Sequence, residues 1–433
     1  MIKTDLTQVN KTDKGLWICY GMFLLVSAIV SFSSNSQDVY KAATFYSPWI
    51  SHMTKLLMGL VVIFFMQFMP VRVLRNISPA LFWISIFTQI LCFVPGIRVN
   101  NIHGVYRTIH VPGFPMDLQP DEYIKFTLIL YLAIIIIDFL HTEDTERRKN
   151  LKIKYAVATI AAIITVIPYH TSTAMMYLAT AVMMVFVSGL YTRQIIFGIV
   201  AAAIVGVIGV WSLVGLRHAG VQLPWRLATV AGRVDRFIKD EPDEIKYNIK
   251  ADPKTAQLKY CKISIANGAG IIGTGPGKSL ERDVLPVANA DCVFAIIVEE
   301  WGWIGILVTL SLYMFLLNRV GYIVKKSYDD YMSLVALSCG LFIALQALIS
   351  IICVLDIMPA TGQPLPFISV GGNSALSMGF GLGTIMCISK AQRTELNRIQ
   401  DIEQTSEETS RPVITFDDDN EEETPQDDII IEQ

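Results

Sequence analysis

The sequence predicts an all-α integral membrane protein, with about ten transmembrane helices and one long extracytoplasmic loop between spans 7 and 8. Three observations predict this fold class. Apolar residues make up 53% of the chain and charged residues 17%, against roughly 45–50% and about 25% in ordinary soluble domains. Apolar runs that meet or approach the length of a membrane span recur along the chain. Every second connection between these runs is basic, as cytoplasmic loops are.

The apolar runs are the candidate spans, because a transmembrane helix needs around 20 mostly apolar residues. Backbone groups in hydrocarbon must be hydrogen-bonded within the protein, so the runs are expected to form helices rather than isolated strands. In chain order they are Leu16–Ser33, Leu56–Val71, Ala80–Val94, Phe126–Leu140, Tyr155–Ile167, Ala174–Tyr191, Ile195–Leu216, Cys292–Leu317, Met332–Val354 and Ile368–Ile388.

The basic residues of the short connections predict the orientation, because positively charged loops remain in the cytoplasm. Both termini are therefore expected to be cytoplasmic, and an even number of spans agrees with this. The basic residues on the predicted cytoplasmic side are Lys3, Lys11, Lys14, Arg72, Arg75, Arg147, Arg148, Lys149, Lys152, Lys154, Arg193, Arg319, Lys325, Lys326, Lys390, Arg393 and Arg398.

The chain is expected to divide into three parts. Residues 1–15 form a cytoplasmic N-terminal segment, residues 16–390 the ten-span membrane domain, and residues 391–433 a cytoplasmic tail. The membrane domain includes an extracytoplasmic loop at residues 217–290, and loops of that length are often functional. The tail is acidic and lacks the apolar side chains needed to fold, so we expect it to be disordered. It is either a solvated tail or a docking segment for a cytoplasmic partner.

Composition also excludes some function classes. The net charge of −3 gives no reason to propose a nucleic-acid partner. The seven cysteines form no C-x-x-C pair, and no histidines have H-E-x-x-H spacing, so neither a disulfide framework nor a zinc site is predicted. We expect the cysteines to be small buried hydrophobic residues.

A glycine-rich segment at Asn267–Ser279 is the most informative stretch of the chain. It is not a phosphate-binding P-loop, because Ile272 stands where that motif requires glycine. Closely spaced glycines still indicate that the backbone bends sharply or approaches another group. With Lys278 and Ser279 at its end, the segment could approach a lipid-linked phosphate. A glycine-rich re-entrant turn is the equal alternative.

Three acidic residues lie close to or within the eighth span. Asp291 stands at the mouth of that span, where partial desolvation tends to raise a carboxyl pKa toward values useful for proton abstraction. Glu299 and Glu300 lie inside the apolar run, and intramembrane acids mark functional or paired sites. They predict either an acid-lined cavity or a structural ion pair. Upstream, Glu122 and Lys125 are three residues apart and can pair on one helix face.

These motifs together resemble the SEDS family (FtsW/RodA) of peptidoglycan glycosyltransferases. The likeness covers nearly the whole chain except the tail. The segments that carry it are Gly104–Arg107, Gln119–Lys125, Gly273–Ser279, Leu285–Gly302 and Pro359–Ser374.

The chain departs from the family pattern at several places near these motifs. Asn289-Ala290 stands where the family has His-Thr, and Cys292 where it has Phe. Val298 replaces a glycine, and His170 replaces an acidic residue. The run before the paired glutamates, the Gly-Pro-Gly-Lys-Ser sequence and the tail look more FtsW-like than RodA-like.

The resemblance implies an enzyme that polymerises lipid II into glycan strands at the outer face of the bacterial cytoplasmic (inner) membrane, for septal synthesis in cell division. A RodA-type elongation polymerase is the nearest alternative. A lipid II flippase without chemistry and a scaffold that recruits the transpeptidase are rivals from other classes. The implied partners are lipid II, the growing glycan strand, a class B penicillin-binding transpeptidase, other divisome membrane proteins and the lipid bilayer.

The resemblance also implies residue roles. Asp291 would be the general base, and Glu122–Lys125 either a helix-pairing salt bridge or a substrate contact. No protein metal site is expected, although a divalent cation (Mg²⁺ or Mn²⁺) is possible at the pyrophosphate. Candidates for binding lipid II and its pyrophosphate are Arg107, Lys125, Arg233, Arg236, Lys278 and Ser279. Candidates for structural or cavity-lining roles are Glu122, Glu299, Glu300, Pro364, Pro366, Ser369, Gly371 and Gly372.

Overall fold

A computed structural model describes most of the membrane domain. The described residues are 12–39, 44–94, 108–110, 116–168, 170–190, 211–219, 256–280, 289–359 and 361–410, with the single positions 197, 209, 221 and 232. Within these residues the fold is entirely helical, apart from one isolated antiparallel bridge between Ile109 and Leu118.

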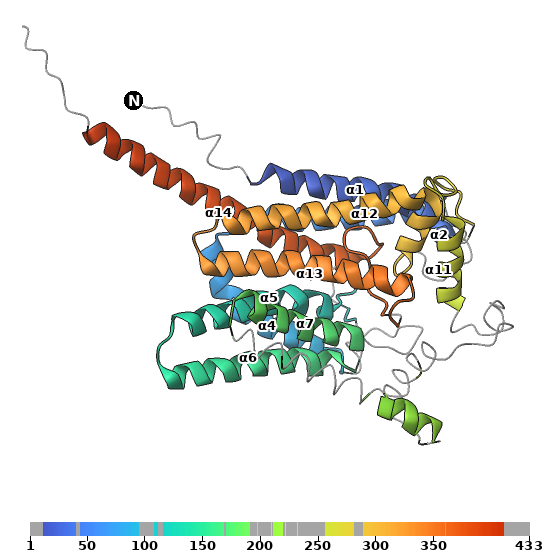
Figure 1. The fold of residues 1–433 in the computed structure, drawn as a ribbon, viewed down its shortest axis with the longest axis horizontal. Helices are drawn as coiled ribbons and strands as arrows, with labels where there is room; N and C mark the ends of the chain where they lie inside the picture. Colours follow the sequence, from blue (N-terminus) through green and yellow to red (C-terminus); the bar gives the residue numbers. More distant parts are fainter. Residues whose placement is uncertain are drawn as a thin grey trace, which may run out of the picture.

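The long helices run side by side, and the short helix α11 lies across one end of them (Figure 1). The helices are α1 (Lys14–Ser34), α2 (Ser36–Val39), α3 (Ser47–Met66), α4 (Val71–Leu91), α5 (Pro120–His141), α6 (Thr145–Val166), α7 (Thr171–Val187), α11 (Ala256–Asn267), α12 (Val293–Lys325), α13 (Asp330–Val354) and α14 (Gly372–Ser410).

The prediction of an all-α integral membrane protein is confirmed. Five described helices, α1, α3, α5, α12 and α13, are long and apolar enough to cross a membrane, and α7 is a shorter apolar helix. The number of ten spans stays a prediction, because most of the seventh run, Ile195–Leu216, lies outside the described residues.

The second and third spans begin earlier in the chain than the apolar runs predict. α3 starts at Ser47 rather than Leu56, because Pro48 in its first turn is well placed to begin a helix. α4 starts at Val71 rather than Ala80, directly after Pro70, which cannot continue the preceding helix. Arg72 and Arg75 therefore lie in the first turns of α4 and not in a loop, but they stay at the predicted cytoplasmic end.

α5 is the most enclosed of the five described spans. In the most apolar window of α5, 72% of the residues are buried, against 28% in α3. The outward residues of α3, such as Phe64 and Phe65, are exposed large hydrophobic side chains, as a lipid-facing helix requires. The core thus surrounds α5, and lipid is expected to cover α3.

Ion pairs join three helices at the predicted cytoplasmic end. Asp13 caps α1 by accepting from the backbone N–H groups of Gly15 and Leu16. The same carboxylate pairs with Arg319 of α12 and lies 4.0 Å from Arg393 of α14. The backbone of α14 then continues as helix through Ser410, so helix extends into the segment predicted as a disordered tail. Residues 411–433 lie outside the described part.

Candidate functional site

Asp291 lies two residues before the start of α12, in a turn that a distant segment holds in place. The backbone N–H of Val370 donates to the Asn289 carbonyl at 2.8 Å. The Ser369 hydroxyl donates to the Ala290 carbonyl at 2.6 Å and accepts from the Leu365 N–H at 2.9 Å. The proline-rich segment before α14 therefore fixes the backbone on which the candidate base is carried.

Gly362 brings that proline-rich segment against the carboxylate itself. Its φ is +67°, a conformation that glycine adopts without strain. A Cβ at this position would lie 3.3 Å from the Asp291 Oδ2 atom, closer than ordinary contact. Asp291 is half-buried, so its side chain keeps a path to the surface.

Buried polar residues at the end of α1 line the other side of the turn. The Asn289 side-chain amide donates to Asn35 Oδ1 at 3.1 Å. The Ser33 hydroxyl donates to the Glu300 carboxylate. Ser33 and Asn35 are both buried, so the first span ends in a polar region beside the Asp291 turn.

The glycine-rich segment packs on a break in α12 at Gly302, where φ is +58° and ψ is −140°. In a regular helix the N–H groups of Trp303 and Ile304 would bind the carbonyls of Glu299 and Glu300. Here these N–H groups donate to the carbonyls of residues 270 and 271, each at 3.2 Å. The freed carbonyls accept from the N–H groups of residues 274 and 275, at 2.8 and 2.9 Å. This contact supports a re-entrant turn, and phosphate binding by the segment stays a prediction.

The Glu299 carboxylate is fully buried and accepts hydrogen bonds from neutral donors. Ser279 Oγ donates at 2.5 Å, the Leu280 N–H at 2.9 Å and the Asn267 amide at 3.4 Å. Sequence reasoning left an acid-lined cavity or an ion pair open for this residue, and the described partners are instead hydroxyl and amide groups. Ser279 is itself buried and directed at Glu299, whereas its neighbour Lys278 is exposed.

Lys125 is completely buried in an ion pair with Glu122, with Nζ and Oε1 2.7 Å apart. Lys125 Nζ also donates to the Gln346 side chain of α13 at 3.2 Å, and Gln346 Nε2 donates to the Pro364 carbonyl at 3.1 Å. This chain of contacts joins α5, α13 and the proline-rich segment. The ion pair itself lies within α5, and the contact with α13 is the hydrogen bond from Lys125 to Gln346. A helix-pairing role and a substrate contact both stay predictions.

Some of the remaining predicted residues lie in the proline-rich segment, and the others lie outside the described residues. Pro366 accepts from the Tyr313 hydroxyl at 2.6 Å, which ties the proline-rich segment to α12. Gly371 and Gly372 stand where α14 begins, and a Cβ on Gly372 would lie 2.7 Å from Met116 Cε. The predicted pyrophosphate ligands Arg107, Arg233 and Arg236 lie outside the described residues.

The sequence analysis gave no site role to Gly362, Asn35 or Gln346. Gln346 has a usable signal, since an amide inside an apolar span must find a partner. Asn35 belongs to a polar run at the end of the first span. That run alone does not indicate a buried contact, because the partner residue Asn289 lies in a distant segment. Gly362 has no sequence signal for its contact with Asp291, because that contact joins residues 71 positions apart.

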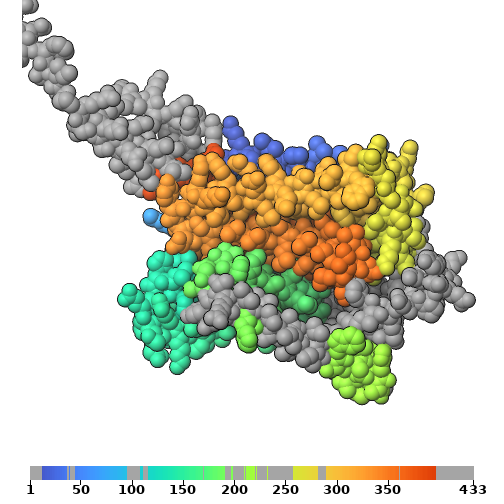
Figure 2. All heavy atoms as spheres, in the orientation of Figure 1, coloured from blue at the N-terminus to red at the C-terminus, as the bar shows by residue number. Residues whose placement is uncertain are grey.

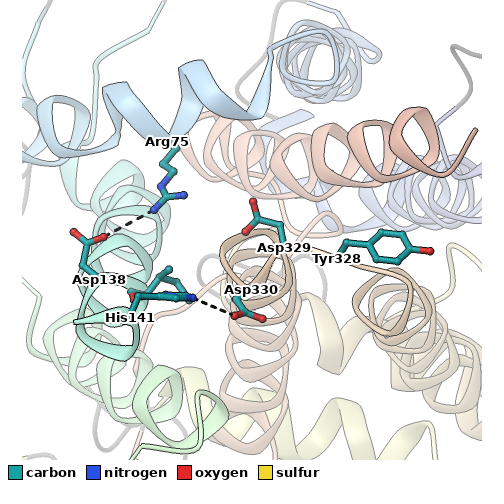
Figure 3. A pocket seen from close by; sticks show the side chains of 7 residues that line it. Arg75, Asp138, His141, Tyr328, Asp329 and Asp330 are labelled. Atoms are coloured by element: carbon teal, nitrogen blue, oxygen red, sulfur yellow. Dashed lines mark hydrogen bonds and ion pairs between the residues drawn. The ribbon is translucent and has the colours of Figure 1, made fainter. Parts of the chain in front are cut away.

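A polar pocket lies at the opposite end of the bundle, where α4, α5 and α13 begin or end (Figure 3). Arg75 lies 3.9 Å from Asp138, and His141 lies 4.0 Å from Asp330. His141 is 19 residues beyond Glu122 in α5, which is about 28 Å along a helix. The pocket is therefore separate from the Asp291 turn.

A family model and several curated proteins are similar to this chain over most of its length. The family model FTSW_RODA_SPOVE, described as cell cycle protein, matches residues 13–394. Stage V sporulation protein E of Bacillus subtilis (strain 168) is 27% identical over 337 residues, 77% of this chain and 85% of that protein. The probable peptidoglycan glycosyltransferase FtsW of Enterococcus hirae is 29% identical over 308 residues, 70% of this chain and 72% of that protein.

Solved structures share the fold. One is a chain from the work described as "Structural coordination of polymerization and crosslinking by a peptidoglycan synthase complex". It has a TM-score of 0.68 and 22% identity, covering 88% of this chain and 98% of that chain. The rod shape determining protein RodA of Thermus thermophilus has a TM-score of 0.60 and 21% identity, covering 88% of this chain and 97% of that chain.

Proposed function

The chain belongs to the cell cycle protein family of FtsW, RodA and SpoVE, and from this premise we propose that it is a peptidoglycan glycosyltransferase that polymerises lipid II into glycan strands. Several relatives over two thirds or more of the chain are named probable peptidoglycan glycosyltransferase FtsW. The observation that carries the proposal is the half-buried Asp291 carboxylate, held at the mouth of α12 by Ser369 and Val370.

Asp291 is the general base of the proposed reaction. A sugar hydroxyl of lipid II attacks the anomeric carbon of the growing strand, and the bond from that carbon to the pyrophosphate oxygen breaks. The hydroxyl proton passes to the Asp291 carboxylate, and polyprenyl pyrophosphate leaves as an anion. A base positioned for such a transfer contributes on the order of 10²–10⁴ in rate.

The leaving pyrophosphate requires positive charge nearby. Among the described candidates Lys278 is exposed, whereas Lys125 is buried and already paired with Glu122. Lys278 is therefore the better candidate in the described part of the chain, together with Arg107, Arg233 and Arg236 from the loops. The described residues contain no group of three or more His, Cys, Asp or Glu that could hold a metal ion. A Mg²⁺ or Mn²⁺ ion would accordingly be bound through the pyrophosphate itself.

The reaction is proposed to take place at the outer face of the bacterial cytoplasmic membrane, with both termini in the cytoplasm. The Asp291 turn lies at the end of the bundle opposite Arg319, Arg75 and Arg393, which the positive-inside rule assigns to the cytoplasm. A division role is proposed because the relatives are named FtsW, with RodA-type elongation as the alternative. The partner is proposed to be a class B penicillin-binding transpeptidase, since one structural neighbour comes from a complex that couples polymerization and crosslinking.

The test is polymerisation of purified lipid II by the full-length protein in lipid, with and without its transpeptidase and divalent cations. We expect glycan chains from the wild type and a loss on the order of 10²–10⁴ in rate for Asp291→Asn. Asp330→Asn is the matched control, because it neutralises an exposed aspartate in the pocket at the far end of the bundle.

Each result has a distinct meaning. Equal rates for the wild type and Asp291→Asn would contradict the assignment of the base but keep the polymerase. No polymer from the wild type under any of these conditions would contradict the polymerase. A flippase or a scaffold would then be favoured, and lipid II transport or transpeptidase binding would distinguish them.

A further inference from the structure

Two cysteine side chains meet beside the candidate base. Cys261 lies in α11, and Cys292 is the residue that directly follows Asp291 and precedes α12. Their thiols are hydrogen-bonded to each other, and both side chains are buried, with 1% and 2% of their surface exposed. Gln257, one turn before Cys261 in α11, donates to Cys292 Sγ at 3.1 Å. Both cysteines are free thiols in the structure.

The other five cysteines have different surroundings. Cys19, Cys92, Cys353 and Cys387 each donate to a backbone carbonyl, and Cys339 lies buried within α13. In the described part of the chain, the pairing of two thiols is therefore restricted to Cys261 and Cys292. The pair joins two consecutive elements of the described chain, because Cys261 lies in α11 and Cys292 directly precedes α12.

α11 is firmly placed over this end of the bundle. Figure 2 shows the atoms of α11 and of the glycine-rich segment covering the end of α12 and α13. Lys262, the neighbour of Cys261, pairs with Asp356 after α13 at 2.5 Å. The Lys262–Asp356 ion pair and the bond from Gln257 to Cys292 Sγ hold α11 where the thiols of Cys261 and Cys292 are in contact. A disulfide requires the two side chains to approach each other in this way.

We propose that Cys261 and Cys292 form a redox-modification site, in which an intramolecular disulfide joins α11 to the residue beside Asp291. The oxidant is a disulfide, carried by an extracytoplasmic thiol–disulfide oxidoreductase or by a small molecule. One cysteine thiolate attacks a sulfur of that disulfide, which forms a mixed disulfide and releases one thiolate of the oxidant. The other cysteine thiolate then attacks the protein sulfur of the mixed disulfide and displaces the oxidant's second thiolate. Two thiols lose two protons and two electrons, and the oxidant is reduced to two thiols. The inference rests on the extracytoplasmic placement in the proposed function, because disulfides persist in that compartment.

The packed pair is expected to react slowly. The hydrogen bond to Cys292, followed by burial, raises the pKa of the Cys261 thiol, and exchange requires the thiolate. Oxidation is therefore expected before α11 docks during folding, or when α11 lifts from the bundle. Once formed, the link closes a loop that contains the whole glycine-rich segment, and a closed loop of this kind restricts the unfolded chain.

The test counts thiols in the full-length protein in the membranes of cells with an oxidising extracytoplasmic compartment. Cells are quenched in acid, denatured and labelled with a maleimide that adds a fixed mass per thiol, with or without prior reduction. We expect five labelled thiols before reduction and seven after it, since the chain has seven cysteines. Peptide mass spectrometry should find a disulfide-linked pair that contains Cys261 and Cys292.

Two variants provide the controls. In Cys261→Ser, the released Cys292 should become labelled without reduction, giving six thiols before and after reduction. In Cys353→Ser, which removes a buried cysteine bonded to Thr361 rather than to a thiol, the difference of two thiols should remain. On reduction the thermal midpoint of the wild type should fall by several degrees, and that of Cys261→Ser should stay unchanged.

Seven labelled thiols in the unreduced wild type would overturn the proposal, and so would a disulfide between other cysteines. An equal shift of the thermal midpoint in the wild type and in Cys261→Ser would also overturn it. The thiol count does not use lipid II. A failure of this inference is therefore distinguishable from a failure of the polymerase.

Discussion

Gly362 packs its backbone against the Asp291 carboxylate and contributes no side chain of its own. Its positive φ lets the proline-rich segment turn directly against Oδ2. Any side chain at this position would need both an unfavourable backbone conformation and space that the carboxylate occupies. The geometry of the base therefore depends on a residue that sequence reasoning did not single out.

Replacing Gly362 by alanine is expected to lower polymerisation more than stability. Left-handed backbone costs an L-residue roughly 1–2 kcal/mol, and the added Cβ would press on Asp291 at 3.3 Å. We expect a folded protein with a clearly reduced rate, measured by glycan synthesis and by thermal unfolding of the same preparations.

The matched control for this substitution is Gly321→Ala in α12. No atom lies within 4 Å of a Cβ at Gly321, and its backbone is helical. Alanine there should leave the rate unchanged and stabilise the helix by roughly 0.5–1 kcal/mol. A Gly362→Ala variant with wild-type activity would show that the proline-rich segment does not position the base.

The sequence predicts the place of Asp291 well, because a carboxylate at the end of an apolar run can be recognised locally. It does not predict the partners of that residue. Ser369 and Val370 reach the turn from about 80 residues further along the chain, and no periodicity records such a contact. The same holds for Glu299: its burial is predictable, whereas its bond from Ser279 depends on how the glycine-rich segment returns to α12.

Among the helices, α5 and α13 depend on one buried ion pair and one amide. Lys125 lies in the core with Glu122 and Gln346 as partners, and all three side chains are buried within the protein. A buried pair of this kind is weak evidence for net stabilisation, but removing one partner leaves a charge that nothing compensates.

Lys125→Met is expected to destabilise the protein by roughly 3–5 kcal/mol, because the Glu122 carboxylate would remain buried without its cation. The double variant Glu122→Gln/Lys125→Met should recover much of that loss, since both charges are absent. Unfolding by heat or denaturant in detergent measures both changes. If Lys125 only pairs helices, the double variant should also recover polymerisation. Recovered stability with no activity would instead indicate a substrate contact.

The sequence predicts which segments of this chain are helices better than it predicts the residues at which those helices begin and end. Each apolar run outside the seventh overlaps one described helix, because run length decides whether a segment spans the membrane. A helix that begins with polar residues, such as α3 at Ser47–Pro48, starts before the apolar run by which the span is recognised. The break at Gly302 was not predicted either, since α12 reads as one continuous apolar helix until its contact with residues 270–275 is known.

For the whole molecule, orientation is the property on which the proposed function most depends. Exposed Lys278 lies at the Asp291 end of the bundle, and exposed Lys326 follows the far end of α12. The native cysteines are all buried, so the wild type gives a low background for thiol labelling in the folded state.

A membrane-impermeant maleimide applied to intact cells should label Lys278→Cys, because that residue is proposed to face outward. Lys326→Cys should be labelled only after the membrane is disrupted, which makes each variant the control for the other. The reverse pattern would place the glycine-rich segment in the cytoplasm and contradict synthesis at the outer face.

The break in α12 also bears on the order in which the protein is made. Unpaired backbone groups are unfavourable in lipid, so a span interrupted at Gly302 needs partners for the groups that the interruption frees. Those partners lie in residues 270–275, which leave the ribosome before α12 does. The broken span can therefore be completed as soon as it is synthesised, without waiting for α13 or α14. A circular permutation that placed this segment after α12 would remove that advantage while keeping every contact of the finished fold.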